Sequence, residues 1–213
     1  VERLGDEHES IYYITAPSIE AARRSPHLEA FRDRGIEVLV FTDRVDEMWL
    51  SSIGEYKDKK FQSVGHGEVD LGDSKAEGDD TSDSEKSETE PAPGDRLSAL
   101  RVALQEEVTE VRTSKRLTTS AACLVTPEGT MSLQMEQLMR ASGQKMPEIK
   151  RILEINPKHP VTDRLVEMLK TDKDSPAVGD YAQLLFGQAL LAEGGQLTDP
   201  VAFARRVSDL MAR

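Results

Sequence analysis

The sequence predicts an α+β protein with two folded parts and an unstructured connection. A strand, helix, strand pattern in residues 1–70 indicates a small βαβ subdomain. Residues 71–94 lie in the most acidic stretch and are expected to form a disordered linker. Residues 95–213 mix helix and strand patterns and are expected to form a second α+β domain. It ends in two apolar helices that suit an intermolecular four-helix bundle.

Composition limits the possible partners. Only 38% of the 213 residues are apolar, which is low for a single compact body of this size. The net charge of −12 argues against a nucleic-acid partner. No apolar run approaches the roughly 20 residues of a membrane-spanning helix, so no membrane partner is expected. A single cysteine, Cys123, fits a reducing compartment, and we expect a cytoplasmic protein. Because the chain starts at Val1 and soon reaches a strand pattern, we expect a fragment of a longer protein.

The acidic stretch holds most of the charge. Residues 65–95 contain eleven acidic residues and two lysines, a net −9 of the total −12. Residues 74–95 contain no aromatic residue and no Val, Ile, Leu or Met, so little apolar burial offsets an ordering cost of about 1–2 kcal/mol per residue. Calcium binding would use the carboxylates of Asp79, Asp80, Asp83 and Glu85. The glycine turn and ligand order of a calcium loop are missing, which favours a solvated spacer.

The first part has a βαβ pattern. Strands are predicted at Ile11–Ile14 and Ile36–Phe41, both buried, with a helix at Ser18–Arg24 between them. The first turn, residues 15–18, lacks the glycines that bring a backbone close to a dinucleotide pyrophosphate. His27 has no ligand partner at metal-binding spacing, which favours a structural histidine.

An amphipathic helix is predicted at Asp43–Ile53. It contains Trp49, the one tryptophan, which we expect to be half-buried. The alternative is a solvent-facing Trp49 that contacts a partner.

The second part mixes helices and strands. Helices are predicted at Arg96–Glu106 and from Pro160 to Lys170, and a further strand at Arg151–Ile155. Val108–Leu117 and Ala121–Val125 are expected to pair as a hairpin.

A methionine-bearing helix is predicted to begin at Thr130 and to end at residues 142–143. Its apolar face would consist of Met131, Met135, Leu138 and Met139. A methionine face can adapt to irregular apolar partners, but it also fills ordinary cores, and the pattern leaves both readings open.

The last two helices are expected to dimerise the chain. Tyr181–Ala192 is apolar nearly all round and needs a packing partner on a second side. A further helix begins at residues 199–200, and a second copy of the pair would complete a bundle by two-fold symmetry. The candidate interface residues are Leu184, Leu185, Leu190, Leu191, Phe203, Val207 and Leu210.

Five stretches resemble the heat shock protein 90 chaperone family, most closely its bacterial branch, high-temperature protein G. They are SPHLEAFRDRGIEVLVFTDRVDE (25–47), KKFQSV (59–64), KRLTTSAACLV (115–125), ASGQKMPEIKRILEINPKHP (141–160) and LLFGQALLAEGGQLTDPVAFARR (184–206). The resemblance implies that residues 1–70 end the family's middle domain and that residues 95–213 form its C-terminal dimerisation domain.

The resemblance also implies what the chain lacks. The family binds ATP and Mg²⁺ in an N-terminal domain, which is expected to lie outside this chain, so no cofactor and no catalytic residue are assigned here. The chain ends SDLMAR, without the acidic pentapeptide that recruits tetratricopeptide-repeat partners in eukaryotic members.

The family's client-contacting positions map onto two helices. Met48 takes the place of an aromatic residue, Trp49 follows it, and Ser51 is the other matching position. Met131, Met135, Leu138 and Met139 match the apolar face of a client-contacting helix.

The leading hypothesis is a homodimeric chaperone fragment that binds non-native client proteins. An enzyme would need a constellation of catalytic or metal-binding side chains, whereas the histidines are scattered at His8, His27, His66 and His159. The remaining alternative is a pure oligomerisation module without a client surface. Exposure of the methionine face separates the two.

Overall fold

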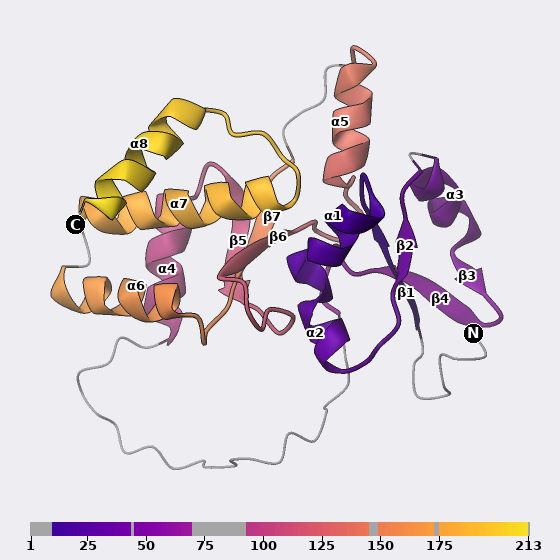
Figure 1. Cartoon of the computed structure of the whole chain (residues 1–213), viewed down its shortest axis with the longest axis horizontal. Helices are drawn as coiled ribbons and strands as arrows, with labels where there is room; N and C mark the ends of the chain where they lie inside the picture. The colour runs from indigo at the N-terminus through magenta and orange to yellow at the C-terminus, as the bar shows by residue number, and fades with distance from the viewer. Residues whose placement is uncertain (1–9, 44, 70–92, 145–148, 173–174, 213) are drawn as a thin grey trace.

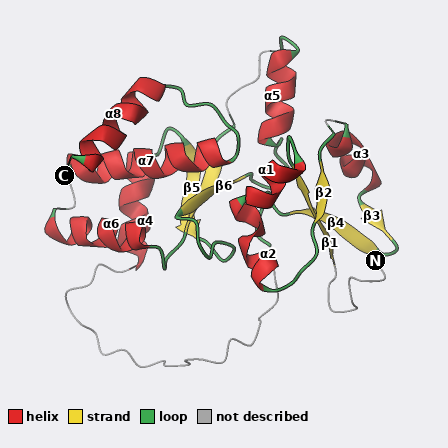
Figure 2. Cartoon of the chain, in the orientation of Figure 1, coloured by secondary structure: helices red, strands yellow, loops and turns green. Residues whose placement is uncertain are grey.

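The computed structural model describes residues 10–43, 45–69, 93–144, 149–172 and 175–212. Two small sheets and eight α-helices within these ranges give a mixed α+β architecture (Figures 1 and 2). We call residues 10–69 the N-terminal part and residues 93–212 the C-terminal part. The predicted linker lies outside the described residues except for its last two, with which helix α4 begins. His8 also lies outside them.

The N-terminal part contains a four-stranded sheet. Strand β1 (Ser10–Thr15) pairs in parallel with β2 (Leu39–Phe41) and with β4 (Lys59–Ser63). Strand β3 (Glu55–Tyr56) is antiparallel to β4, which gives the order β2-β1-β4-β3. The expected strand, helix, strand order is therefore observed.

Strand β2 differs from its prediction. It covers three residues rather than six, and Leu39 is 46% exposed where a buried strand was expected. The cause is its place at the edge of the sheet, where it has one strand neighbour. Ile36 and Val38, just before it, supply the partial packing against the core.

Helices cover the two faces of this sheet differently. Helix α1 (Ile19–Arg24), the 3₁₀ turn Pro26–Leu28 and α2 (Glu29–Asp33) pack on the face that carries Tyr12 and Ile14. Side chains alternate between the faces of a strand, so Tyr13 points to the other side.

Helix α3 (Asp46–Ile53) covers that other side through its tryptophan. The Trp49 ring packs edge-on against Phe41 and Phe61, with ring centroids 5.5 and 6.3 Å away. The expectation of a half-buried Trp49 is confirmed. The helix begins three residues later than predicted, because Asp43 lies in a turn whose backbone N–H donates to the Asp46 carboxylate at 2.9 Å.

The C-terminal part contains a three-stranded sheet, and its order corrects the predicted hairpin. Strands β5 (Val108–Thr113) and β6 (Ala122–Val125) do not pair; β7 (Arg151–Ile155) lies between them. It runs parallel to β5 and antiparallel to β6. All five residues of β7 are buried, as expected for a strand with a neighbour on each side.

Three helices cover one face of this sheet: α4 (Pro93–Ala103), α6 (Pro160–Thr171) and α7 (Pro176–Ala192). Helix α8 (Pro200–Met211) lies against α7, where Gly187 leaves room for the Phe203 ring. A Cβ at that glycine would be 2.7 Å from the ring. No helix in the described ranges has both the length and the apolarity needed to cross a membrane.

Helix α5 (Leu133–Ala141) stands apart from these layers. Figure 1 shows it projecting from the body between the α7–α8 pair and α3. It begins later than predicted, because Ser132 rather than Thr130 is its cap: the Ser132 hydroxyl accepts a hydrogen bond from the Met135 N–H at 3.1 Å. Met131 therefore precedes the helix instead of extending its apolar face.

Candidate functional site

Helix α5 is anchored by charge rather than by an apolar core. Its one buried residue is Glu136, whose carboxylate lies 2.8 Å from the Arg151 guanidinium of β7. Arg140, one turn later, contacts the same carboxylate at 2.6 Å, and Arg151 also donates to the Thr126 hydroxyl at 2.8 Å. Burial lowers the pKa of Arg151, and Glu136 opposes that shift. Helix α5 is therefore held to β7 by the Glu136–Arg151 ion pair.

Those apolar residues are only partly covered. Met135, Leu138 and Met139 are half-buried on the helix, and Met131 is half-buried just before it. None of the four belongs to the buried core clusters of the described residues.

A groove of about 380 Å³ separates α5 from the N-terminal part, and we call it the α5 groove. One wall is α5 itself. The other wall lies where the parallel strands β1 and β2 end and α3 begins. Its described lining residues are Thr15, Ala16, Pro17, Thr42, Asp43, Glu47, Gln134, Met135, Gln137, Leu138 and Ala141.

The structure brings only some predicted client positions to this groove. Met135 and Leu138 line it, whereas Met48 is 56% exposed on α3 and is not among its lining residues. Trp49 is engaged in the aromatic cluster, and its indole N–H donates to Asp46 at 3.0 Å. The side chain of Ser51 lies outside what the structure describes.

Exposed apolar side chains also gather on the elements around α3. They belong to the edge strand β2, to α3 with its preceding turn, and to β3. They are Leu39, Val40, Val45, Met48, Ile53 and Tyr56.

Sequence reasoning missed the polar residues of this site. Glu47 directly precedes Met48, a predicted client position. Its place on the same helix could have marked it as a candidate. The Glu136–Arg151 pair joins residues on a helix and a strand, and the sequence pattern gives no signal for it.

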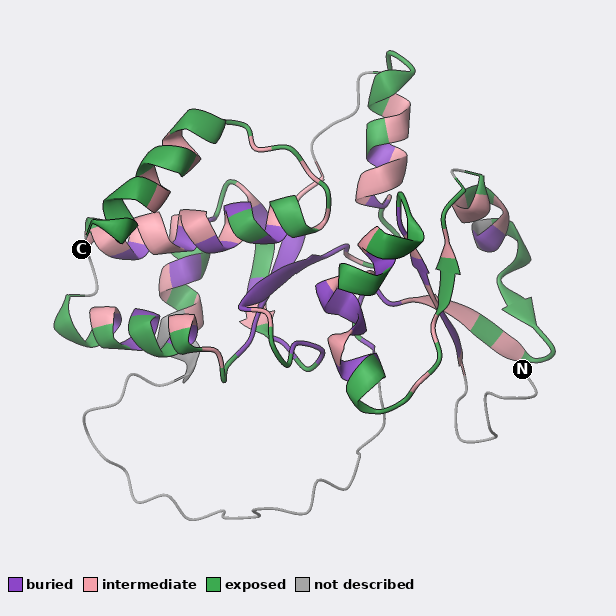
Figure 3. Ribbon diagram, viewed as in Figure 1, coloured by how far each residue is buried: buried purple, intermediate pink, exposed green. Residues whose placement is uncertain are grey.

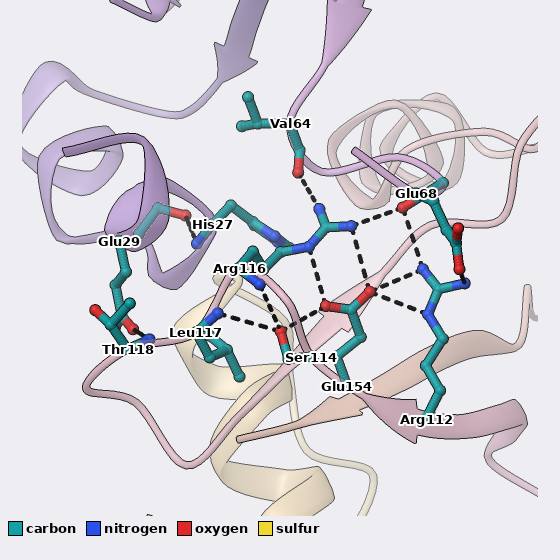
Figure 4. A network of polar contacts seen from close by, with 12 residues as sticks. His27, Glu29, Val64, Glu68, Arg112, Ser114, Arg116, Leu117, Thr118 and Glu154 are labelled. Carbon is teal, nitrogen blue, oxygen red and sulfur yellow. Dashed lines mark hydrogen bonds and ion pairs between the residues drawn. The ribbon is translucent and has the colours of Figure 1, made fainter. Parts of the chain in front are cut away.

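A buried network joins the two parts, as Figure 4 shows. Its centre is the Glu154 carboxylate of β7, which accepts hydrogen bonds from Arg112, Arg116 and Ser114 at 2.8–3.3 Å. Arg116 also donates to the backbone carbonyls of Val64 and Gly67 in the N-terminal part. A change at Glu154 would therefore loosen both the sheet and the junction.

A second junction contact is made by Glu29 of α2. Its carboxylate accepts hydrogen bonds from the backbone N–H groups of Thr118, Thr119 and Ser120 at 2.7–3.1 Å, and from the Ser120 hydroxyl. Burial would raise the pKa of Glu29, but these hydrogen bonds outweigh it and lower the pKa to about 2. The same segment was expected to be the simple turn of a hairpin.

Two histidines line a cavity of about 340 Å³ at the junction. His27 Nε2 lies 2.8 Å from the Glu193 carboxylate at the end of α7, which supports its expected structural role. The His66 ring is hydrogen-bonded to the Ser63 hydroxyl at 2.9 Å. Burial, with the charges of Arg151 and His27, lowers the pKa of His66 to about 4. Among the described residues, no group of three or more His, Cys, Asp or Glu side chains could hold a metal ion.

The candidate interface residues on α7 and α8 differ in exposure. Leu185 is 4% exposed and belongs to the chain's own core, so it is not available to a partner. Leu191 and Leu210 are 47% and 38% exposed. Leu184, Leu190, Phe203 and Val207 are half-buried.

Helix α8 has no buried residue, as Figure 3 shows. A groove of about 700 Å³ opens beside it, with Met168 of α6, Tyr181 of α7 and Leu210 of α8 in its walls.

Comparison with known proteins adds the following. Residues 1–213 match the family described as Hsp90 protein. The Chaperone protein HtpG of Rhodococcus jostii is 47% identical over 216 residues, which cover 100% of this chain and 33% of that protein. The proteins of the same name from Mycobacterium avium and Frankia casuarinae are 45% and 44% identical, over 100% of this chain and 32% of each relative. The chain therefore spans about a third of the length of these relatives.

Proposed function

The chain belongs to the Hsp90 protein family, and from this premise we propose that it is a dimerising segment of a chaperone that also binds non-native client proteins. The chain covers about a third of its chaperone relatives, so any activity of a whole protein is part of this proposal.

One observation carries the client-binding proposal: the buried residue of α5 is a glutamate, while its methionines are half-exposed and Met135 lines a groove. A helix held by its apolar face would bury that face. Flexible, polarisable methionine side chains suit irregular apolar partners. The surface of α5 and its groove is therefore the proposed client site, and the exposed Met48 extends it along α3.

The dimerisation proposal is supported by α7 and α8. Helix α8 lies on the surface with both apolar and polar residues exposed. Leu191 and Leu210 are exposed and belong to none of the buried core clusters of the described residues. A second copy would cover them, and the groove beside α8 offers a place for a partner helix.

Light scattering tests the dimer. Leu210→Glu places a charge on the proposed interface without touching the core, and we expect it to weaken dimerisation about tenfold to a hundredfold. Val102→Glu, at a 70% exposed site on α4, is the matched control and should leave the dimer intact. An unchanged dimer in Leu210→Glu would refute this interface.

The same samples separate a chaperone segment from a pure oligomerisation module. Affinity for a permanently unfolded protein is measured by fluorescence anisotropy. A dimer that binds no unfolded protein would favour the oligomerisation module.

ATP and Mg²⁺ are assigned to no residue of this chain. The proposal places nucleotide binding in a separate domain, and it places the protein in the cytoplasm.

A further inference from the structure

The α5 groove has two chemically different walls. The α5 wall presents Met135, Leu138 and Ala141. The opposite wall lies at the carboxyl ends of two parallel strands, a position where α/β sheets commonly bind ligands. It carries Asp43, after β2, and Glu47, in the first turn of α3.

The charged groups among the described residues of this groove are acidic. Among its described lining residues, Asp43 and Glu47 are the ones that carry a charge, and the others are neutral. Glu47 is half-buried, and no described Lys, Arg or His lies within ion-pair distance of its carboxylate. The Asp43 carboxylate accepts a long hydrogen bond from the Val45 N–H at 3.5 Å.

The field of Glu47 also reaches into the fold. Burial raises the pKa of Tyr13 on β1, and Glu47 raises it further. A carboxylate in such partly desolvated surroundings attracts a cation more strongly than one in open water.

We infer that the α5 groove selects client segments in which an apolar side chain lies next to a lysine or arginine. The apolar group contacts the α5 wall, and the cation pairs with Glu47 and Asp43. This inference rests on the proposed client-binding function and names the class of segment that the site prefers.

Three labelled peptides test the preference. They share a serine–glycine backbone with three leucines and differ only in whether Lys, Gln or Glu flanks each leucine. Fluorescence anisotropy with the whole chain should show the tightest binding for the Lys peptide and the weakest for the Glu peptide. Because the ion pairs are partly exposed, we expect affinity to fall about two- to fivefold from the Lys to the Gln peptide and again from the Gln to the Glu peptide. These differences in affinity should become smaller at 1 M salt, where the Debye length is only about 3 Å.

Variants locate the contact. Glu47→Gln should remove most of the Lys-over-Gln preference, while Met135→Ala should weaken all three peptides alike. Gln137→Lys adds a positive charge to the groove from the exposed side of α5, and it should shift the preference toward the Glu peptide. Glu106→Gln is the matched control for Glu47→Gln, at an exposed site outside the groove, and it should leave the peptide preference unchanged.

Several results would overturn the inference. Equal binding of the Lys and Glu peptides, with clear affinity for both, would remove the charge preference and leave client binding intact. A Lys preference that survives in Glu47→Gln would place the cation elsewhere. Binding of none of the peptides would refute the proposed function as well. A changed oligomeric state in Glu47→Gln with unchanged peptide affinity would make a second copy the occupant.

Discussion

Helices α5 and α7 are both rich in apolar residues, yet they are held in opposite ways. Helix α7 buries Val178, Ala182, Leu185 and Ala189 in the core of the C-terminal part. Helix α5 buries Glu136 and leaves its methionines half-exposed. Apolar content alone therefore does not identify a core helix. Where a polar group supplies the anchor, apolar side chains remain available for binding.

The largest expected effect comes from removing the anchor of α5. Glu136→Ala leaves the buried Arg151 guanidinium without its carboxylate, and losing one partner of a buried pair costs about 3–5 kcal/mol. We expect a lower urea midpoint and faster amide exchange across α5. Glu167→Ala breaks an exposed pair with Arg164 and should cost less than about 1 kcal/mol. Equal costs would mean that the α5 anchor is no stronger than a surface pair.

The apolar side of the comparison is tested in α7. Leu185→Ala removes a side chain that is 4% exposed, which should reduce the free energy of unfolding by about 2–5 kcal/mol. Urea denaturation measures this free energy. The chain concentration is held constant, because the proposed dimerisation would also contribute to apparent stability. A cost below about 1 kcal/mol would show that α7 is not packed as described.

The junction between the two parts gives a pH-dependent effect. The pKa of Glu29 is about 2 in the folded chain, below its ordinary 4.5. Its stabilisation is therefore present above about pH 4.5 and is lost as the pH falls toward 2. Glu29→Gln should cost about 1–2 kcal/mol at pH 7, a reduced figure because the group is partly exposed to solvent. The gap between the two proteins should close with decreasing pH in urea titrations; a gap constant from pH 7 to pH 3 would exclude the carboxylate as its source.

Local patterns in the sequence predicted much of this architecture. The strands β1 and β7, the helix α1, the partial burial of Trp49 and the apolar character of α7 were all expected from the periodicity of apolar residues and from helix-start signals. These features depend on residues within one or two turns of each other.

Contacts between residues far apart in the chain were not predicted from the sequence. Strands β5 and β6 are close in the chain, but each pairs with β7. The alternation of residues within a strand does not indicate which strand lies next to it. The contacts of Glu29 reach about 90 residues along the chain. The Glu136–Arg151 pair likewise depends on how α5 meets the sheet. The apolar residues of the candidate site were therefore predicted, whereas its charged residues were not.

The smallest expected change in stability is the most informative for α5. A buried methionine loses about 2–5 kcal/mol when it is truncated to alanine, whereas a half-exposed one loses less than about 1 kcal/mol. Met135→Ala and Met139→Ala should therefore leave the melting temperature within a few degrees, in contrast with Leu185→Ala. Each should weaken binding of an unfolded protein, and the double variant should weaken it further, because adaptable contacts are spread over several side chains. Differential scanning fluorimetry and anisotropy on the same samples measure both quantities. If both variants melted as early as Leu185→Ala and bound client normally per folded molecule, α5 would be a core helix and the client site would lie elsewhere.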